Sequence, residues 1–340
     1  MHYQLPLALF ALSGFMNGCF MLPMSHLKQW KWEQIWLPFI IFACIVMPII
    51  ICSNIITKTY DILPYIPEYY ILFGIITGIM WGFGTIFFSL SVNYLGVSLG
   101  NTLVLSFSSG FGTIFPLLSG TNEVPMPIEG IKNICFGLFI EVIGICLCGI
   151  AGFQREHKNT SVNHKNSSLK MLSAILMAIA SGLMSGIFNI GFSQCKPIIT
   201  YANYHDFNIF EATNIVWLLI LIPGSLPSIF FCSYLIFKKK SRLLNINCQK
   251  SYSRVILYTF SMALLWSGSV FVYGAGAALM THYGPAIGWA SSLGIALLTA
   301  NAGGIINGEW QGTASTTRYI LFGGVLCVFV SIAFIALAAA

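Results

Sequence analysis

The sequence predicts an all-α integral membrane protein in which ten transmembrane helices form two inverted five-helix repeats. Three observations support this fold class: a composition suited to lipid, ten apolar runs of membrane-spanning length, and a motif that recurs in the second half. Of the 340 residues, 57% are hydrophobic and 8% are charged, whereas soluble domains contain about 25% charged residues. Few residues are therefore left for a soluble domain.

Each apolar run is long enough to cross about 30 Å of hydrocarbon as a helix. The runs cover residues 4–24, 34–56, 70–93, 97–119, 132–152, 170–193, 209–237, 255–279, 285–307 and 319–339. The first run has neither a basic segment before it nor a small-x-small cleavage site, so we expect it to be retained as a span. The polar stretch 153–169 is expected to link an N-terminal repeat (1–152) to a C-terminal repeat (170–340).

One motif recurs at a constant separation. Ser13-Gly14-x-Met16-x-Gly18-x-Phe20 returns 168 residues later as Ser181-Gly182-x-Met184-x-Gly186-x-Phe188, and the same register places Lys196 on Lys28. Because each half has an odd number of spans, the second half enters the membrane with the opposite orientation. Inverted repeats of this kind are typical of secondary transporters, in which two halves move about a central site.

The basic residues predict the orientation of the chain. Odd-numbered loops contain 13 of the 16 lysines and arginines, and even-numbered loops contain 3. Because Lys and Arg are retained in cytoplasmic loops, the odd loops are expected in the cytoplasm and both termini in the periplasm. The net charge of +6 is then a topology signal, and nucleic acid is excluded as a partner because no soluble basic face is available.

No motif in the chain supports an enzyme. Walker A, H-E-x-x-H and G-x-S-x-G patterns are absent, so ATP-driven transport and zinc or serine hydrolysis have no sequence support. The ten cysteines are scattered through the spans without a C-x-x-C pair and are interpreted as small hydrophobic residues. We therefore expect no catalytic residue, no metal and no cofactor, and an ion gradient as the energy source.

Polar side chains within the spans fall on helical stripes. The stripes comprise Ser13 and Asn17 in the first span, Thr102, Ser106, Ser109 and Thr113 in the fourth, and Ser181, Ser185 and Asn189 in the sixth. Small and hydroxyl residues are ordinary contacts between membrane helices. Asparagine is costlier in hydrocarbon unless it faces a partner or water. Since Asn17 and Asn189 fall one turn apart when the repeats are superposed, they are expected to face a shared central cavity.

Two tryptophans occupy comparable places in the two halves. Trp81 in the third span and Trp266 in the eighth each follow a short apolar run and precede small residues. An indole can stack on the C–H face of a sugar while its N–H donates a hydrogen bond. The alternative is an interfacial belt, which suits Trp30, Trp32, Trp36 and Trp310 and is weaker for a tryptophan half-way along a span.

Charged residues in or beside the spans offer candidates for coupling and gating. Glu141 lies in the middle of the fifth span, where a carboxylate costs roughly 2.5–3.5 kcal/mol on insertion scales. It is a candidate proton carrier, with a structural role at a helix contact as the alternative. Lys28 and Lys196 lie at the ends of their spans on opposite sides of the membrane and are gate candidates. The alternative for each is that the lysine only extends its side chain from a helix end to the membrane surface.

Several short motifs resemble one transporter family. The run Met80-Trp81-Gly82-Phe83-Gly84, followed by Tyr94-Leu95-Gly96-Val97-Ser98-Leu99-Gly100, resembles the junction of the third and fourth helices in the L-rhamnose-proton symporter family, within the drug/metabolite transporter superfamily. Further similarities extend over essentially the whole chain: Trp30-x-Trp32-Glu33, Lys196-Pro197, Trp266, Tyr273, Trp289 and Gly308-Glu309-Trp310. The superfamily places its fifth and tenth helices outside the central bundle, which favours a structural Glu141 and makes Glu309 the rival proton carrier, with an end-cap role as its own alternative.

The resemblance implies proton-coupled uptake of a small, rhamnose-like sugar by alternating access across a bacterial inner membrane. The candidate substrate-binding residues are Asn17, Trp81, Thr85, Ser106, Ser185, Asn189, Trp266, Tyr273 and Trp289. Expected partners are a sugar-like solute, a proton and the lipid bilayer, and a homodimer is also considered. Substrate identity does not follow, because Ser269, Ala277, Leu279 and Pro285 stand where the rhamnose carriers have further polar and charged residues. An exporter, a carrier of another small polar metabolite or drug, and a non-transporting membrane sensor are the alternatives.

Overall fold

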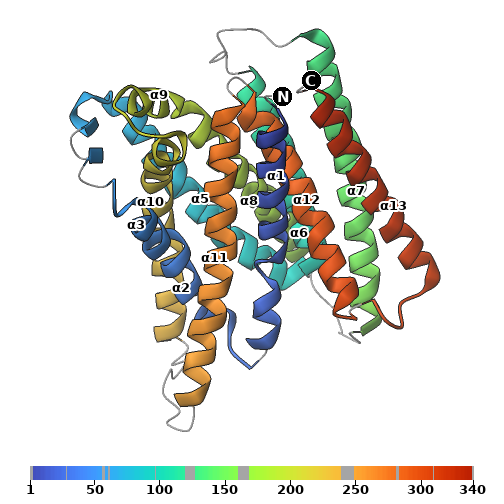
Figure 1. Ribbon diagram of the computed structural model, residues 1–340. Helices are drawn as coiled ribbons and strands as arrows, with labels where there is room; N and C mark the ends of the chain where they lie inside the picture. Colours follow the sequence, from blue (N-terminus) through green and yellow to red (C-terminus); the bar gives the residue numbers. More distant parts are fainter. Residues whose placement is uncertain are drawn as a thin grey trace.

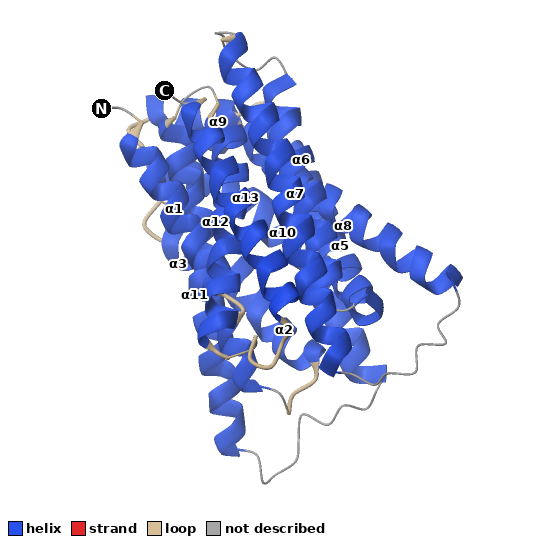
Figure 2. Cartoon of the chain, turned by 90° about the vertical axis from the view of Figure 1, so that its right-hand side faces the viewer, coloured by secondary structure: helices blue, strands red, loops and turns tan. Residues whose placement is uncertain are grey.

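The computed structural model describes residues 3–27, 29–55, 58–59, 62–95, 97–118, 127–159, 168–238, 249–280, 283–308 and 310–338 (Figure 1). Within these ranges, ten helices are long and apolar enough to cross a membrane, which confirms the predicted number of spans. The described chain contains no strand, so the all-α class is also confirmed (Figure 2).

The helices of the first half follow the predicted spans closely. They are α1 (Gln4–Cys19) with the 3₁₀ turn η1 (Leu22–Leu27), α2 (Trp32–Ile41), the π-helical segment η2 (Phe42–Val46), α3 (Met47–Cys52), the 3₁₀ turn η3 (Leu63–Tyr65), α5 (Glu68–Leu95), α6 (Val97–Leu118) and α7 (Ile128–Asn159). Those of the second half are α8 (Ser168–Gln194), α9 (Lys196–Tyr204), α10 (Ile209–Lys238), α11 (Gln249–Leu279), α12 (Gly284–Ile306) and α13 (Ser315–Leu337).

Three features of these helices differ from the expected spans. The second span is divided by the π segment η2 just before Pro48, because proline has no N–H to donate to the carbonyl four residues earlier. The short helix α9 follows α8 directly and begins with Lys196-Pro197. The helix α7 continues to Asn159, so the first part of the expected linker 153–169 is helical, whereas residues 160–167 lie outside the described residues.

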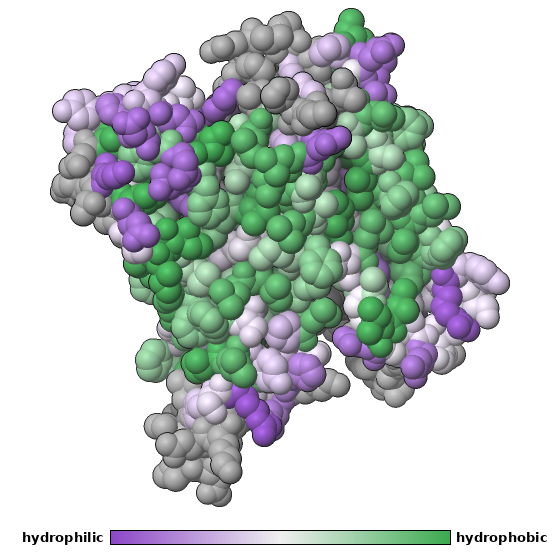
Figure 3. Space-filling model, viewed as in Figure 1, coloured by the Kyte–Doolittle hydropathy of each residue, from purple (hydrophilic) through white to green (hydrophobic). Residues whose placement is uncertain are grey.

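Both chain termini lie at the same end of the molecule (Figures 1 and 2), which we call the termini end. The face of the bundle seen in Figure 3 is predominantly hydrophobic between the two ends, and hydrophilic residues gather toward the ends themselves. This distribution fits a protein whose middle lies in hydrocarbon. The chain is accordingly a multi-pass membrane protein.

The helices α7 and α13 pack along each other at one edge of the bundle (Figure 1). The other helices form a central group in which α8 packs against α5 and α6, while α1 packs against α11 and α12. The expectation that the fifth and tenth spans lie outside the central bundle therefore agrees with the position of α7 and α13.

The glycines of the recurring motif lie at two corresponding helix contacts. A Cβ atom at Gly14 of α1 would lie 2.6 Å from the Ser292 carbonyl oxygen of α12, and one at Gly182 of α8 would lie 2.8 Å from the Val104 carbonyl oxygen of α6. One turn further on, Gly18 again meets α12 and Gly186 again meets α6. Small residues at these positions permit close backbone approach between membrane helices.

At Gly112, α6 packs closely against both α8 and Trp289 of α12. A Cβ atom at Gly112 would lie 2.5 Å from Trp289 Nε1 and 3.2 Å from the Gly186 Cα atom. We predict that Gly112→Ala lowers the free energy of unfolding by about 1–3 kcal/mol, because the added methyl group overpacks this contact. Thermal unfolding of the purified protein measures the change.

The matched control for this substitution is Gly110→Ala on the same helix, because a Cβ atom at Gly110 meets no neighbour within 4 Å. That variant should be neutral or more stable, since Ala is favoured over Gly in a helix by about 1 kcal/mol. Equal destabilisation of both variants would contradict the close α6–α8 contact.

Candidate functional site

A cavity of about 140 Å³ lies inside the central helices. One water molecule occupies about 10–15 Å³ of such a volume, so the cavity has room for several water molecules. Its walls come from both halves of the chain, through α2, α5, α6, α8, α11 and the residue that ends α1. The lining residues are Phe20, Trp36, Phe39, Ile40, Trp81, Gly84, Thr85, Phe88, Val104, Ser181, Ser185 and Trp266. Four of the nine candidate substrate-binding residues, Trp81, Thr85, Ser185 and Trp266, are among them.

Trp81 and Trp266 form one wall of the cavity as a stacked pair. Their ring centroids are 5.4 Å apart and the ring planes meet at 15°. Phe188 of α8 packs beside the pair, with its ring centroid 5.0 Å from that of Trp81. The structure therefore brings together the two tryptophans that the sequence places at comparable positions of the two halves.

Hydroxyl groups form the polar part of the cavity. The Thr85 hydroxyl lies 2.5 Å from that of Ser228 on α10, and the Ser181 hydroxyl donates to the Gly84 carbonyl at 2.8 Å. Ser185 accepts a hydrogen bond of 2.9 Å from the Ser108 hydroxyl of α6. Because a hydroxyl oxygen has two lone pairs, these residues retain the capacity to accept further hydrogen bonds from a ligand.

Asn189 lies outside the cavity and is fully buried. Its amide nitrogen donates to the Gly112 carbonyl of α6 at 2.8 Å and to the Pro285 carbonyl of α12 at 2.9 Å, and its side-chain oxygen accepts from the Tyr273 hydroxyl of α11. All of its polar atoms are thus satisfied by protein. We call this group of residues, Gly112, Asn189, Tyr273 and Pro285, the asparagine network.

The sequence explains why Gly112 takes part in this network. Its carbonyl would ordinarily accept from the N–H four residues later, but that residue is Pro116, which lies inside α6 and has no N–H. A carbonyl without a partner costs several kcal/mol in hydrocarbon. The Asn189 amide supplies the missing donor.

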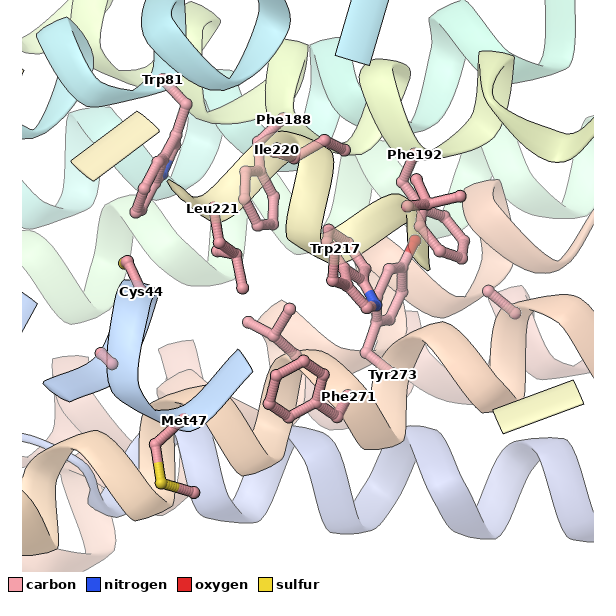
Figure 4. Packing of buried hydrophobic residues seen from close by; sticks show 14 of the residues in the cluster. Cys44, Met47, Trp81, Phe188, Phe192, Trp217, Ile220, Leu221, Phe271 and Tyr273 are labelled. Carbon is pink, nitrogen blue, oxygen red and sulfur yellow. The ribbon is translucent and has the colours of Figure 1, made fainter. Parts of the chain in front are cut away.

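Aromatic rings surround the asparagine network. Tyr273 lies 5.6 Å from Trp289 and 5.9 Å from Phe192 between ring centroids, and Trp289 Nε1 donates to the Ser108 carbonyl at 3.0 Å. Figure 4 shows the row of rings that leads from Trp81 past Phe188 and Trp217 to Tyr273. Tyr273 and Trp289 therefore belong to the network side of the interior and do not line the cavity.

The asparagine network lies nearer the termini end than the cavity does. Along α8 the cavity residue Ser185 precedes Asn189 by four positions, and along α11 Trp266 precedes Tyr273 by seven. Both helices run toward the termini end, so at 1.5 Å per residue the network lies about 6–10 Å nearer that end. A solute in the cavity would have to pass these hydrogen bonds to leave on that side.

Glu141 lies on α7, away from the cavity and fully buried. Neither carboxyl oxygen has a hydrogen-bond partner among the described residues, although the Ser109 hydroxyl of α6 lies beside the carboxyl group. The hydroxyls of Ser109 and Thr113, which are one turn apart on α6, are also buried without partners in the described structure. Glu141 is thus part of a buried polar group, not of the cavity wall.

The remaining candidates are placed as follows. Asn17 is half-buried on α1 and Ser106 is half-buried on α6, where its hydroxyl donates to the Thr102 carbonyl at 2.9 Å; neither lines the cavity. Lys196 lines a separate groove at the termini end together with Tyr69, Tyr70, Tyr201 and Tyr204. Lys28 and Glu309 lie outside the described residues.

Trp36 is a cavity residue that the sequence did not indicate. Its predicted interfacial position is wrong, because its side chain is 5% exposed and lines the cavity, where Nε1 is a buried donor without a partner among the described residues. Trp310 is also buried, beneath the Arg155 guanidinium, whose central carbon lies 4.8 Å from the ring centroid. A period-3.6 pattern cannot separate these cases, since each tryptophan lies near the end of an apolar run.

Comparison with known proteins agrees with the membrane-transporter fold. The family model of the L-rhamnose-proton symport protein matches residues 6–340. The L-rhamnose-proton symporters of Yersinia pestis (strain Pestoides F) and Yersinia pseudotuberculosis serotype O:1b (strain IP 31758) are each 24% identical to the chain over 326 residues, which is 92% of this chain and 89% of each relative.

The asparagine network predicts a specific loss of stability. Tyr273→Phe removes the hydroxyl that Asn189 accepts from, so a fully buried amide oxygen is left without a donor, at a cost of about 1–3 kcal/mol. Thermal unfolding should show a lower midpoint for this variant. Tyr319→Phe, on α13, removes a hydroxyl from a ring that is 76% exposed and should leave the midpoint unchanged. A midpoint for Tyr273→Phe equal to that of the native protein would refute the network.

Proposed function

The chain belongs to the L-rhamnose-proton symport protein family, a family of transporters, and from that premise we propose that it imports a small sugar together with a proton across the bacterial inner membrane. The substrate class that the cavity fits best is a 6-deoxyhexose. Such a sugar presents both hydroxyl groups and a methyl group, and the cavity has a few hydroxyls within a mainly apolar and aromatic wall.

The observation that carries this proposal is the stacked pair of Trp81 and Trp266. Indole faces bind the C–H face of a sugar ring through apolar contact, while indole N–H groups donate hydrogen bonds. The two rings come from different halves, so movement of one half against the other would change the space beside them. We assign stacking to Trp81 and Trp266, hydrogen bonding to Thr85 and Ser185, and a donor role to Trp36 Nε1.

The proposal gives three further residues a role at another stage of the cycle: Asn189, Tyr273 and Trp289. Their polar groups bind one another or backbone carbonyls in the present conformation, so they are unavailable to a ligand in the cavity. Alternating access requires the termini end to open at another point of the cycle. We propose that the asparagine network then separates and that these three side chains contact the sugar on its way in.

The inverted arrangement of residues 1–152 and 170–340 is supported by matching helix contacts. Exchange of the halves converts the pair α5 and α8 into the pair α11 and α1, the pair α5 and α10 into α11 and α2, and the pair α6 and α7 into α12 and α13; all six pairs are in contact. The motif glycines lie at equivalent contacts as well. Two halves that pack in the same way provide the symmetry that alternating access uses.

The orientation we propose places both termini in the periplasm and the cavity on the cytoplasmic side of the asparagine network. A reporter that is active only in the cytoplasm should work when fused after Lys240 and fail when fused at Ala340, because basic loops are retained inside. Fusions at both sites are compared at equal expression. The reverse pattern would overturn the orientation.

Sugar uptake tests the function and the tryptophan pair together. In cells that express the chain, labelled L-rhamnose or another 6-deoxyhexose of a panel should accumulate, and a protonophore should abolish accumulation. Trp81→Ala and Trp266→Ala should each weaken the apparent affinity about fivefold, because loss of one stacking face is worth about 1 kcal/mol.

The matched control for uptake is Phe329→Ala, which removes an aromatic side chain that is 65% exposed on the outer helix α13. It should transport like the native chain. Accumulation that resists the protonophore would contradict proton coupling, and normal affinity in both tryptophan variants would place the sugar elsewhere. No accumulation of any sugar in the panel would refute the import function itself.

A further inference from the structure

The helix α6 presents two rows of polar groups to two different neighbours. Ser109 and Thr113 are the hydroxyls that lie unpaired in the described structure, with Ser109 beside the Glu141 carboxyl of α7. The residues immediately before them, Ser108 and Gly112, form hydrogen bonds with two residues of α8, Ser185 and Asn189. Adjacent residues of a helix point in directions about 100° apart, so α6 lies between Glu141 and the cavity.

The Glu141 side of α6 holds an unusual number of unsatisfied polar groups. Both carboxyl oxygens of Glu141 and the hydroxyls of Ser109 and Thr113 are buried without a hydrogen-bond partner among the described residues. A buried polar group of this kind destabilises the protein when it is left unpaired. These three side chains therefore favour any state of the protein in which they bind one another.

No other charged side chain competes for this position. The helices that pack on α7 are α6, α12 and α13; α6 and α12 contain no Asp, Glu, Lys, Arg or His, and α13 contains only Arg318, in its first turn. Two thiols lie near each other between α7 and α13, Cys148 and Cys327. Glu141 is thus the one acid in the middle of these four helices.

The cavity side of α6 is fully bonded. Ser108 donates to Ser185, which lines the cavity, and the Ser108 carbonyl accepts from Trp289. The Gly112 carbonyl accepts from Asn189 in the asparagine network. Gly112 and Gly186 are in close contact, so α6 has little room to approach α8 further at this point.

We propose that Glu141, Ser109 and Thr113 form the site of the coupling proton and that α6 transmits its occupancy to the sugar cavity through Ser108 and Gly112. This inference rests on the function proposed above. A protonated carboxyl can donate one hydrogen bond, whereas a carboxylate only accepts, so the two forms require different positions of the Ser109 and Thr113 hydroxyls. The movement of α6 between these positions tightens or loosens the bonds to Ser185 and Asn189.

The proton balance of this cycle is simple. The Glu141 carboxylate takes one proton from water on the termini side and releases it to water on the opposite side, and no covalent bond to the sugar forms or breaks. Glu141 and its two hydroxyl neighbours do not touch the sugar. They are positioning residues, and their effect must appear as a coupling between proton and sugar binding, which is reciprocal by thermodynamic necessity.

The test is the pH dependence of L-rhamnose binding to the purified protein, measured by calorimetry, with L-fucose as a second probe. Over the range in which the site titrates, linked binding of one proton changes the affinity by up to about tenfold per pH unit. The native protein should show this dependence. Glu141→Gln should bind the sugar with an affinity that does not change with pH, because the amide cannot exchange a proton.

Two further variants separate transmission from a purely structural role. The double variant Ser109→Ala with Thr113→Val should bind sugar but show a displaced midpoint in its pH profile, because it loses the two hydroxyls that the proposal assigns to the carboxyl. Ser331→Ala is the matched control: its buried hydroxyl donates within α13 itself, to the Val328 carbonyl at 2.8 Å, and its pH profile should equal that of the native protein.

Each possible result decides a different point. A pH dependence that survives in Glu141→Gln overturns the proton site, and an unchanged profile in the double variant overturns its connection to α6. Affinity that follows Na⁺ concentration instead of pH contradicts the proton as the bound ion. If neither sugar binds the native protein at any pH, the proposed function fails, and the inference fails with it.

Discussion

The hydrogen bonds of Asn189 connect four helices at the centre of the bundle, and the rest of the interior is organised around them. A polar side chain survives in hydrocarbon only when its donors and acceptors are satisfied. Pro116 leaves the Gly112 carbonyl without its helical donor, and Asn189 supplies one while Tyr273 satisfies its amide oxygen. These bonds join α6, α8, α11 and α12 on the termini side of the cavity.

The polar groups of α6 therefore differ between its two sides. Toward α8 and α12 its groups are bonded, and toward Glu141 its hydroxyls and the carboxyl lie unpaired within the described structure. A symporter must make the binding of one solute depend on the binding of the other. Such coupling requires an element with two discrete positions, and each binding site must shift the equilibrium between them. In the coupling that we propose, α6 is that element.

The spans could be predicted because some twenty consecutive apolar residues have few other structures available to them. The position of Trp81 opposite Trp266 could also be predicted, since the two halves place them at comparable points. Trp36 could not, because a tryptophan near the end of a span is equally typical of an interface and of an interior. The partners of Asn189 could not be predicted from the sequence. Two of them are backbone carbonyls, and the third is the Tyr273 hydroxyl. Only the spacing of Gly112 and Pro116 indicates that one of these carbonyls lacks its helical donor.

The central claim is that the sugar binds beside Trp81 and Trp266 on the side of the asparagine network that faces away from the termini. An experimental structure with the transported 6-deoxyhexose bound tests this most directly. The account predicts a sugar ring in contact with an indole face of the pair and hydroxyl contacts from Thr85 or Ser185. A sugar bound only in the groove beside Lys196, with the cavity empty of it, would contradict the account.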